Sequence, residues 1–466
     1  MNRLSALMVC LAWAGLATAA PGPGNDRVVT LAVQSAPAPV PALKYQLLPE
    51  VAELNPGNAV PAYLKCFAEQ HQFFFQKEAA EERERVLNGP LSDIKPGSLK
   101  DYGRYALRQA DFAARLEYVD WNLLPQMRAE GYMLLLPEVQ QLRTLASALA
   151  VRCRGQVADK DYDGAVHSLK TIFALARHMG EHPTIITGLV GVAIAQIGLN
   201  QLQELIQQPD APNLYWALTD LPSPLVDNRR GVSADRMMST GTLSDVLDPK
   251  RPWAADEVPG AVKKLTELGV MLAEIPMAAR KPAEEWMKDR LKDEAWLTAA
   301  RKYLTDRGYP AGAVAKYPPE QVLFFKLYAK ARDLRDEALK WMNVPYWQAE
   351  AGFTELTKAP SEMEDRIAQV LVLAVPKVRT AHARLEQRLG LLRVVEAIRL
   401  DGAKNGGKLP ASLSDLSVPV PMDPVTGKAF EYKVDGMTAV LEGKPTQTTG
   451  GSASTIHYKY EVRLRK

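Results

Sequence analysis

The residues with the clearest catalytic spacing are His178, Glu181 and His182, in the segment His178-Met-Gly-Glu-His182. Written H-x-x-E-H, this is the pattern of inverted zinc peptidases. Histidines four positions apart on a helix share a face and can bind one zinc ion, while the glutamate acts as the base. Pro183 opposes this geometry, because the residue before a proline is displaced from the helical region and the two imidazoles should diverge. The segment fits better the end of one helix and the start of the next, with Pro183 in the first turn.

Cys66 and Cys153 are the other residues with possible chemistry, and both lie in helix-like stretches. A disulfide between them is permitted outside the cytoplasm and would stabilise the fold by roughly 4 to 5 kcal/mol. Two separate buried thiols, each acting as a small apolar side chain, are the equal alternative. Neither cysteine has a histidine in a pattern typical of a thiol nucleophile.

The sequence contains no phosphate-binding loop, dinucleotide fingerprint or G-x-S-x-G motif in a suitable context. It therefore predicts no catalytic residues and no cofactor.

The first residues have the pattern of an export signal. Arg3 gives a positive start, an apolar run follows from Leu4 to Leu16, and small residues precede a cleavage site after Ala19. The run is too short to span a bilayer, which favours a removed signal over an anchor. We expect export to the periplasm or the extracellular space.

Composition limits the classes of partner. Apolar residues make up 47% of the chain and charged residues 24%, as in ordinary folded proteins. The net charge is +3, or about +2 without Arg3, which gives no electrostatic reason to expect nucleic acid or an anionic membrane as partner.

Periodicity predicts a mainly α protein, in which a multi-helix domain is followed by a small C-terminal α+β module with an antiparallel sheet. The expected divisions are a signal peptide (1–19), a flexible linker rich in Pro, Gly and Ala (20–41), the first half of a helical domain (42–220), an irregular connection (221–258), the second half of the helical domain (259–376), and a C-terminal helix with its sheet (377–466).

Two helical segments stand out in the first half. Residues 139–158 and 162–179 predict an antiparallel hairpin, with Asp161 as the N-cap of the second helix, and they resemble a tetratricopeptide unit without a second copy. Residues 184–202 carry no charge, which is typical of a transmembrane helix, but their glycines and amides favour a helix buried in the protein. Membrane association is thus possible but not favoured.

The C-terminal part changes from helical to alternating patterns. A helix from Lys377 should end at Asn405, before two glycines. Residues 430–434 and 437–441 flank Asp435-Gly436, a strong hairpin signal, and residues 456–464 alternate without a break. We expect these three strands to pack on the helix.

Three stretches resemble known groups of proteins. Leu43-Lys-Tyr-Gln-Leu-Leu-Pro-Glu50 with Asn55-Pro-Gly-Asn-Ala59, and Pro212-Asn-Leu-Tyr-Trp-Ala-Leu218, resemble exported proteins of planctomycete-type bacteria. That group has no assigned activity, so this resemblance implies export and a helical architecture.

The third stretch joins Leu409-Pro-Ala-Ser-Leu-Ser-Asp-Leu416 to Asp423-Pro-Val-Thr-Gly-Lys-Ala-Phe-Glu-Tyr432, and it resembles the end of a type II secretion pseudopilin. There a long helix also leads into a small antiparallel sheet. The resemblance suggests that Asp423, close to Thr426 and Gly427, contributes to a calcium site. A turn formed by Asp423 and Pro424 explains the same residues without an ion. This chain departs from the family by lacking a leader followed directly by a long apolar helix, so the resemblance implies a shared module and not filament assembly.

These observations favour an exported, non-catalytic scaffold or adaptor of the cell envelope with a protein partner. A zinc-dependent hydrolase using His178, Glu181 and His182 is one alternative. A protein with a transmembrane-like helix at 184–202 is the other.

Overall fold

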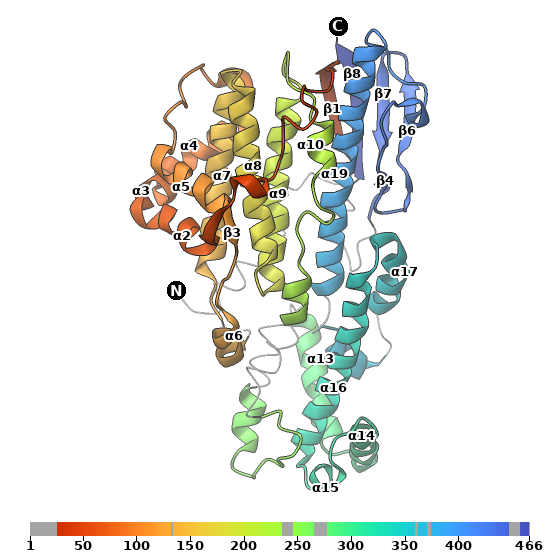
Figure 1. Cartoon of the computed structure of the whole chain (residues 1–466). Coiled ribbons are helices and arrows are strands. Elements are labelled where there is room, and N and C mark those ends of the chain that lie inside the picture. Colours follow the sequence, from red (N-terminus) through yellow and green to blue (C-terminus); the bar gives the residue numbers. More distant parts are fainter. Residues whose placement is uncertain are drawn as a thin grey trace.

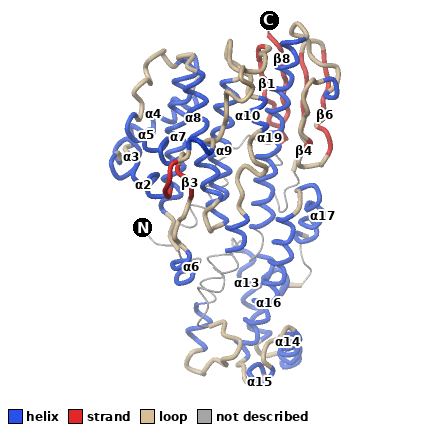
Figure 2. The backbone as a smooth tube through the Cα atoms, viewed as in Figure 1, coloured by secondary structure: helices blue, strands red, loops and turns tan. Residues whose placement is uncertain are grey.

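The computed structural model describes residues 26–131, 134–234, 246–264, 277–358, 362–370, 374–446 and 457–465. Within these ranges most of the regular structure is helical, which confirms the prediction of a mainly α protein. Figure 2 shows that strands β1, β8 and β6 gather on one side of the molecule, beside the helix α19.

Three long helices in sequence order form the centre of the upper part of the molecule (Figure 1). They are α7 (Pro137–Ala158), α8 (Tyr162–Gly180) and α9 (Ile185–Leu205). The predicted hairpin of α7 and α8 is confirmed, and the Asp161 carboxylate accepts the N–H of Gly164 at 3.0 Å. Lys160 adopts a φ of 59°, which lets the chain reverse between the two helices.

Shorter elements cover the outer side of α7 and α8, where α4 and α5 contact them directly. They are β2 (Asn55–Asn58), α2 (Ala59–Glu69), α3 (His71–Phe75), α4 (Lys77–Asn88), α5 (Arg104–Ala114), β3 (Leu116–Tyr118) and α6 (Leu124–Glu130). Strands β2 and β3 pair in parallel. The inner face of α5 is lined by alanines and Leu107, which allows it to pack closely.

The predicted C-terminal helix and its strands are confirmed. Helix α19 (Ala374–Lys404) ends before Gly406 and Gly407, which both take positive φ. The strands are β4 (Met422–Asp423), β5 (Lys428–Ala429), β6 (Glu431–Asp435), β7 (Thr438–Glu442) and β8 (His457–Arg465). Antiparallel pairing joins β6 to β7 and β7 to β8. Alternate residues of β8 are buried, from Tyr458 to Leu464, and β8 packs on α19.

The prediction of a flexible linker at 20–41 is wrong, because part of this segment forms strand β1 (Asp26–Gln34). This strand pairs in parallel with β8 over its whole length, so that Asp26 lies opposite His457 and Gln34 opposite Arg465. The sheet order is β1-β8-β7-β6, an antiparallel sheet with one parallel strand added. Leu31 and Val33 are fully buried, so apolar alternation drives the pairing despite the Pro-rich flanks.

One large core joins the first helices, α19 and the sheet, because its members run from Leu31 to Leu464. Smaller cores lie in the segment between Val232 and Val375. The helices there are α13 (Met277–Arg290), α14 (Glu294–Asp306), α15 (Ala311–Val314), α16 (Pro319–Lys340), α17 (Tyr346–Thr357) and α18 (Met363–Val370). After Val226, the next residues that contribute buried side chains to the large core belong to α19.

Short elements complete the described chain. Helix α10 (Tyr215–Thr219) packs on α19. The single 3₁₀ turns are η1 (Val51–Glu53), η2 (Leu91–Asp93), η4 (Trp341–Asn343) and η5 (Leu413–Asp415). Of the expected irregular connection at 221–258, residues 221–228 and 246–257 are without regular elements and residues 235–245 lie outside the described part, but residues 229–234 are helical, so the prediction is wrong there.

Candidate functional site

The three residues of the H-x-x-E-H motif have separate surroundings. The ring nitrogen Nδ1 of His178, in the last turn of α8, lies 2.9 Å from the Tyr63 hydroxyl. His182 lies beyond the helix, where its Nδ1 is 3.0 Å from the Thr184 hydroxyl and its ring packs on Trp121. Glu181 is exposed to solvent. Burial lowers the pKa of His178 to about 4 and that of His182 to about 3, so both are neutral at pH 7.

The predicted zinc arrangement is therefore not formed. Helix α8 ends at Gly180, and Thr184, one residue after Pro183, starts α9 as its N-cap, so the two histidines do not share a helical face. Among the residues that the structure describes, no group of three His, Cys, Asp or Glu side chains could hold a metal ion. The break predicted from Pro183 is the physical reason.

Cys66 and Cys153 are both buried thiols and are not joined by a disulfide. Cys66 Sγ donates to the carbonyl of Ala62 at 3.7 Å, and Cys153 Sγ donates to the carbonyl of Ala165 at 3.6 Å. Burial raises the pKa of Cys153 to about 12, which keeps it protonated and unreactive. The alternative of two separate apolar thiols is the one that the structure has.

Asp423 organises the turn between β4 and β5. Its Oδ1 accepts the N–H of Val425 and the Gln387 amide, both at 2.9 Å, and its Oδ2 accepts the N–H of Lys444 at 3.0 Å. The carboxylate oxygens thus face N–H donors, the arrangement expected of the turn alternative and not of a calcium ligand.

The uncharged segment 184–202 forms most of α9. In the described part of the chain, α9 is the one helix long and apolar enough to cross a membrane by length and composition. Within its most apolar window 56% of the residues are buried, and α9 contacts α7, α8 and α19. A core helix of a folded domain has these properties.

A stripe of amides runs along one side of α9 at Gln196, Asn200 and Gln203 and continues to Gln207 in the turn just after the helix, with spacings of four, three and four positions. This spacing places them on a single face. The stripe is directed at α19 and the sheet, because Gln207 Oε1 accepts the N–H of Ala32 in β1 at 3.4 Å. The role of this stripe was not predicted, although the regular spacing of polar residues in an otherwise apolar helix is a signal for it.

The stripe binds a buried arginine of α19. Arg388 is 2% exposed, and its guanidinium donates to Gln196 Oε1 and Asn200 Oδ1 at 2.7 Å each and to Gln203 Oε1 at 3.2 Å. Its Nε donates to the Tyr460 hydroxyl at 3.4 Å. All these partners are neutral, so Arg388 holds the amides in fixed orientations without forming an ion pair with them.

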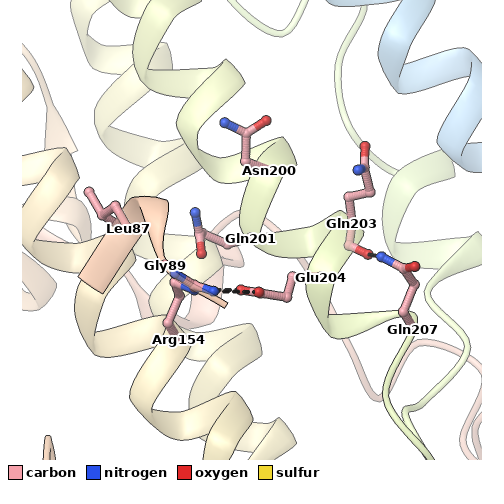
Figure 3. Close-up of a pocket in the computed structure, with 8 residues that line it drawn as sticks. All are labelled: Leu87, Gly89, Arg154, Asn200, Gln201, Gln203, Glu204 and Gln207. Carbon is pink, nitrogen blue, oxygen red and sulfur yellow. Dashed lines mark hydrogen bonds and ion pairs between the residues drawn. The ribbon is translucent and has the colours of Figure 1, made fainter. Parts of the chain in front are cut away.

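A pocket of about 280 Å³ opens over the C-terminal half of α9 (Figure 3). Five residues of this segment form its floor, namely Asn200, Gln201, Gln203, Glu204 and Gln207. Its wall is formed by Leu87 and Gly89, at the end of α4, and by Arg154 of α7. The pocket is open to solvent, and its lining comes from the end of α4, from α7 and from the C-terminal part of α9 with the turn that follows it.

The two charged residues that line the pocket, Arg154 and Glu204, neutralise each other in a bidentate ion pair (Figure 3). Arg154 Nε lies 2.7 Å from Glu204 Oε2, and its NH2 lies 2.6 Å from Oε1. Gln201 is 7% exposed, and its Oε1 is buried without a hydrogen-bond partner among the described residues. A buried amide of this kind is rare and calls for an explanation.

A buried ion pair of α19 connects this helix to β1. Arg399 and Glu396 are fully buried, 2.7 Å apart. Arg399 donates to the carbonyls of Gln34 at 2.8 Å and Ala211 at 2.8 Å, and Glu396 Oε2 accepts the N–H of Leu214 at 2.5 Å. Asn213 and Leu214 therefore connect the segment 212–218 to α19.

The outer face of the first helices exposes large apolar side chains. On α5, Tyr105 is 68% exposed and Phe112 is 48% exposed, and seven positions place both on one face. Leu64 on α2 and Phe75 on α3 are also exposed, and α2 packs against α5 (Figure 1). We refer to Leu64, Phe75, Tyr105 and Phe112 as the outer apolar face.

No known protein family, curated protein or solved structure matches the chain.

Proposed function

We propose that this protein is an exported, non-catalytic scaffold or adaptor of the cell envelope, and that a protein partner binds its outer apolar face. The observation that supports this proposal is the exposure of two aromatic rings, Tyr105 and Phe112, on the solvent side of a helix. The inner side of the same helix is buried through Ala106, Leu107 and Ala110, so the rings are not needed for the fold.

Aromatic side chains are enriched at protein interfaces, where they bury large areas at a small entropic cost. Tyr105 and Phe112 lie seven positions apart on one face of α5, where the two exposed rings form one apolar strip. The partner should therefore present an apolar surface. Export follows from the signal pattern of residues 1–19 and is part of the proposal.

The experiment is cross-linking of intact cell envelopes, followed by purification of the tagged full-length protein and mass spectrometry of attached proteins. The variants Tyr105→Glu and Phe112→Glu place charges on the outer apolar face and should abolish recovery of the partner. Met437→Glu is the matched control, because Met437 is 75% exposed but lies in the turn between β6 and β7.

Recovery of one stoichiometric partner, lost in both face variants and kept in the control, supports the proposal. A partner that is recovered equally from all variants would place the interface elsewhere. Release of the processed protein by osmotic shock without detergent, with a new N-terminus after Ala19, tests the export part separately.

A further inference from the structure

Residues 223–231, which we call the strap, connect the large core to the smaller cores that follow it in the chain. Leu225 and Val226 of the strap are buried and belong to the large core. Val232, the residue just after the strap, belongs to one of the smaller cores. The strap is therefore the joint between these two parts of the fold.

Glycines let the strap lie directly against the start of α9. A Cβ atom on Gly191 of α9 would lie 3.0 Å from Cγ1 of Val226. A Cβ atom on Gly231 of the strap would lie 2.7 Å from the carbonyl of Thr184, the N-cap of α9. Any side chain at these two positions would push the strap away from the helix.

A few hydrogen bonds hold the strap from two sides. On α19, Glu386 accepts from the Ser223 hydroxyl at 2.9 Å and from the N–H of Leu225 at 3.0 Å. On the opposite side, the amide of Asn228 donates to the carbonyl of Ile185 at 3.2 Å. The strap thus bridges α19 and α9 through individual side-chain contacts, which can open without unfolding either helix.

His182 lies where the strap meets the start of α9. The side chain is fully buried, its Nδ1 lies 3.0 Å from the Thr184 hydroxyl, and its Nε2 has no hydrogen-bond partner among the residues that the structure describes. Trp121 packs on the ring, and Arg230 faces it from the strap. Burial and the positive charge of Arg230 both disfavour a charged imidazole and lower the pKa of His182 to about 3.

We propose that the strap is released in acid, when His182 takes up a proton. A charged ring in the docked state would have no acceptor at Nε2 and would be repelled by Arg230. Release of the strap brings water to the ring and loosens the joint between the large core and the smaller cores. This inference does not rest on the outer apolar face, so either proposal can fail while the other stands.

The other titratable groups at the strap have to be separated from His182. Burial lowers the pKa of His382 on α19, and Arg379 adds to this effect, whereas Asp227 of the strap opposes it. Asp227 itself pairs with Arg229. Burial raises the pKa of Glu386, so protonation of this carboxyl favours the docked strap and opposes release. The contribution of His182 must therefore be measured as a difference between the wild type and a His182 variant.

The test is amide hydrogen exchange of the purified full-length protein at pH 7 and pH 5, with each rate divided by the intrinsic rate at that pH. His182→Gln is the reference, because glutamine is polar but does not titrate. The pKa of His182 is about 3 in the docked state and near 6.5 in water. Between pH 7 and pH 5, protection of the strap should therefore fall about twentyfold more in the wild type than in His182→Gln.

His71→Gln is the matched control, because His71 is an exposed histidine on α3. The strap of this variant should respond to pH as the wild type does. If His182→Gln does not fold, NMR of the wild type replaces the comparison, and the His182 ring should titrate at the pH at which the strap loses protection.

Three results would overturn the proposal. In the first, the strap of the wild type keeps its protection at pH 5. In the second, the strap of His182→Gln loses as much protection as that of the wild type, or the His182 ring titrates independently of the strap. In the third, α7 and α8 lose protection together with the strap, which would show unfolding of the large core instead of release.

Discussion

Replacing Glu396 by glutamine should greatly reduce the free energy of unfolding, because Glu396 is fully buried between two donors. Its Oε1 accepts from Arg399 at 2.7 Å and its Oε2 accepts the N–H of Leu214 at 2.5 Å. A glutamine has one oxygen, so its NH2 group would face either a guanidinium or a backbone N–H, and both are donors. The substitution also leaves the Arg399 charge buried without a counter-ion.

Breaking a buried pair by removing one partner typically costs 3 to 5 kcal/mol. We expect about 3 kcal/mol at least, a large part of the 5 to 15 kcal/mol that stabilises a typical domain. Arg399, the partner of Glu396, also donates to the Gln34 carbonyl at the end of β1, so the loss should reach the N-terminal strand.

The assay is urea denaturation followed by circular dichroism, with amide hydrogen exchange of β1 as the local readout. Asp306→Asn is the matched control, because Asp306 pairs with Lys302 on an exposed helix surface, where such pairs contribute less than about 1 kcal/mol. A loss below about 1 kcal/mol for Glu396→Gln, or unchanged exchange in β1, would refute the reasoning.

Three further predictions follow from burial. His178 and His182 have folded-state pKa values of about 4 and about 3, below the unfolded value near 6.5, so only the unfolded chain gains protons between these limits. The melting temperature should therefore fall as the pH drops from about 6.5 towards 4, and His178→Gln should make this dependence shallower. Leu31→Ala should cost about 2 to 5 kcal/mol in denaturant titrations, since Leu31 is fully buried; a cost near zero would mean that β1 is not docked. Cys66 and Cys153 should react with a thiol reagent only after unfolding, and rapid reaction of the native protein would contradict their burial.

Local signals in the sequence predicted the elements that local interactions define. The hairpin of α7 and α8 follows from Asp161, whose side chain caps α8, and the β6–β7 hairpin follows from the turn at Gly436, which has a φ of 57°. In both cases neighbouring residues make the deciding contacts. The predicted divergence of the two motif histidines is confirmed for the same reason, since Pro183 acts on its neighbour.

The pairing of β1 with β8 could not be predicted in this way, because the two strands come from opposite ends of the chain. A short apolar alternation among prolines and glycines looks like a linker until its partner is known. The amide stripe of α9 could not be predicted for the same reason, because it depends on a contact between residues far apart in the sequence. Arg388 and Asn200 come from distant helices, and only their contact turns an amide in an apolar segment into an oriented donor.

The parallel arrangement of β1 and β8 also determines how the molecule responds to mechanical load. Asp26 begins β1 and Arg465 ends β8, and the parallel register places these two residues at opposite ends of the paired strands. Tension between these two points is directed along the strands, so it shears the ladder and loads its hydrogen bonds together instead of opening them one at a time. Resistance to force depends on the rate of unfolding, which such a shear geometry slows. The pairing of β1 with β8 thereby resists tension applied between Asp26 and Arg465.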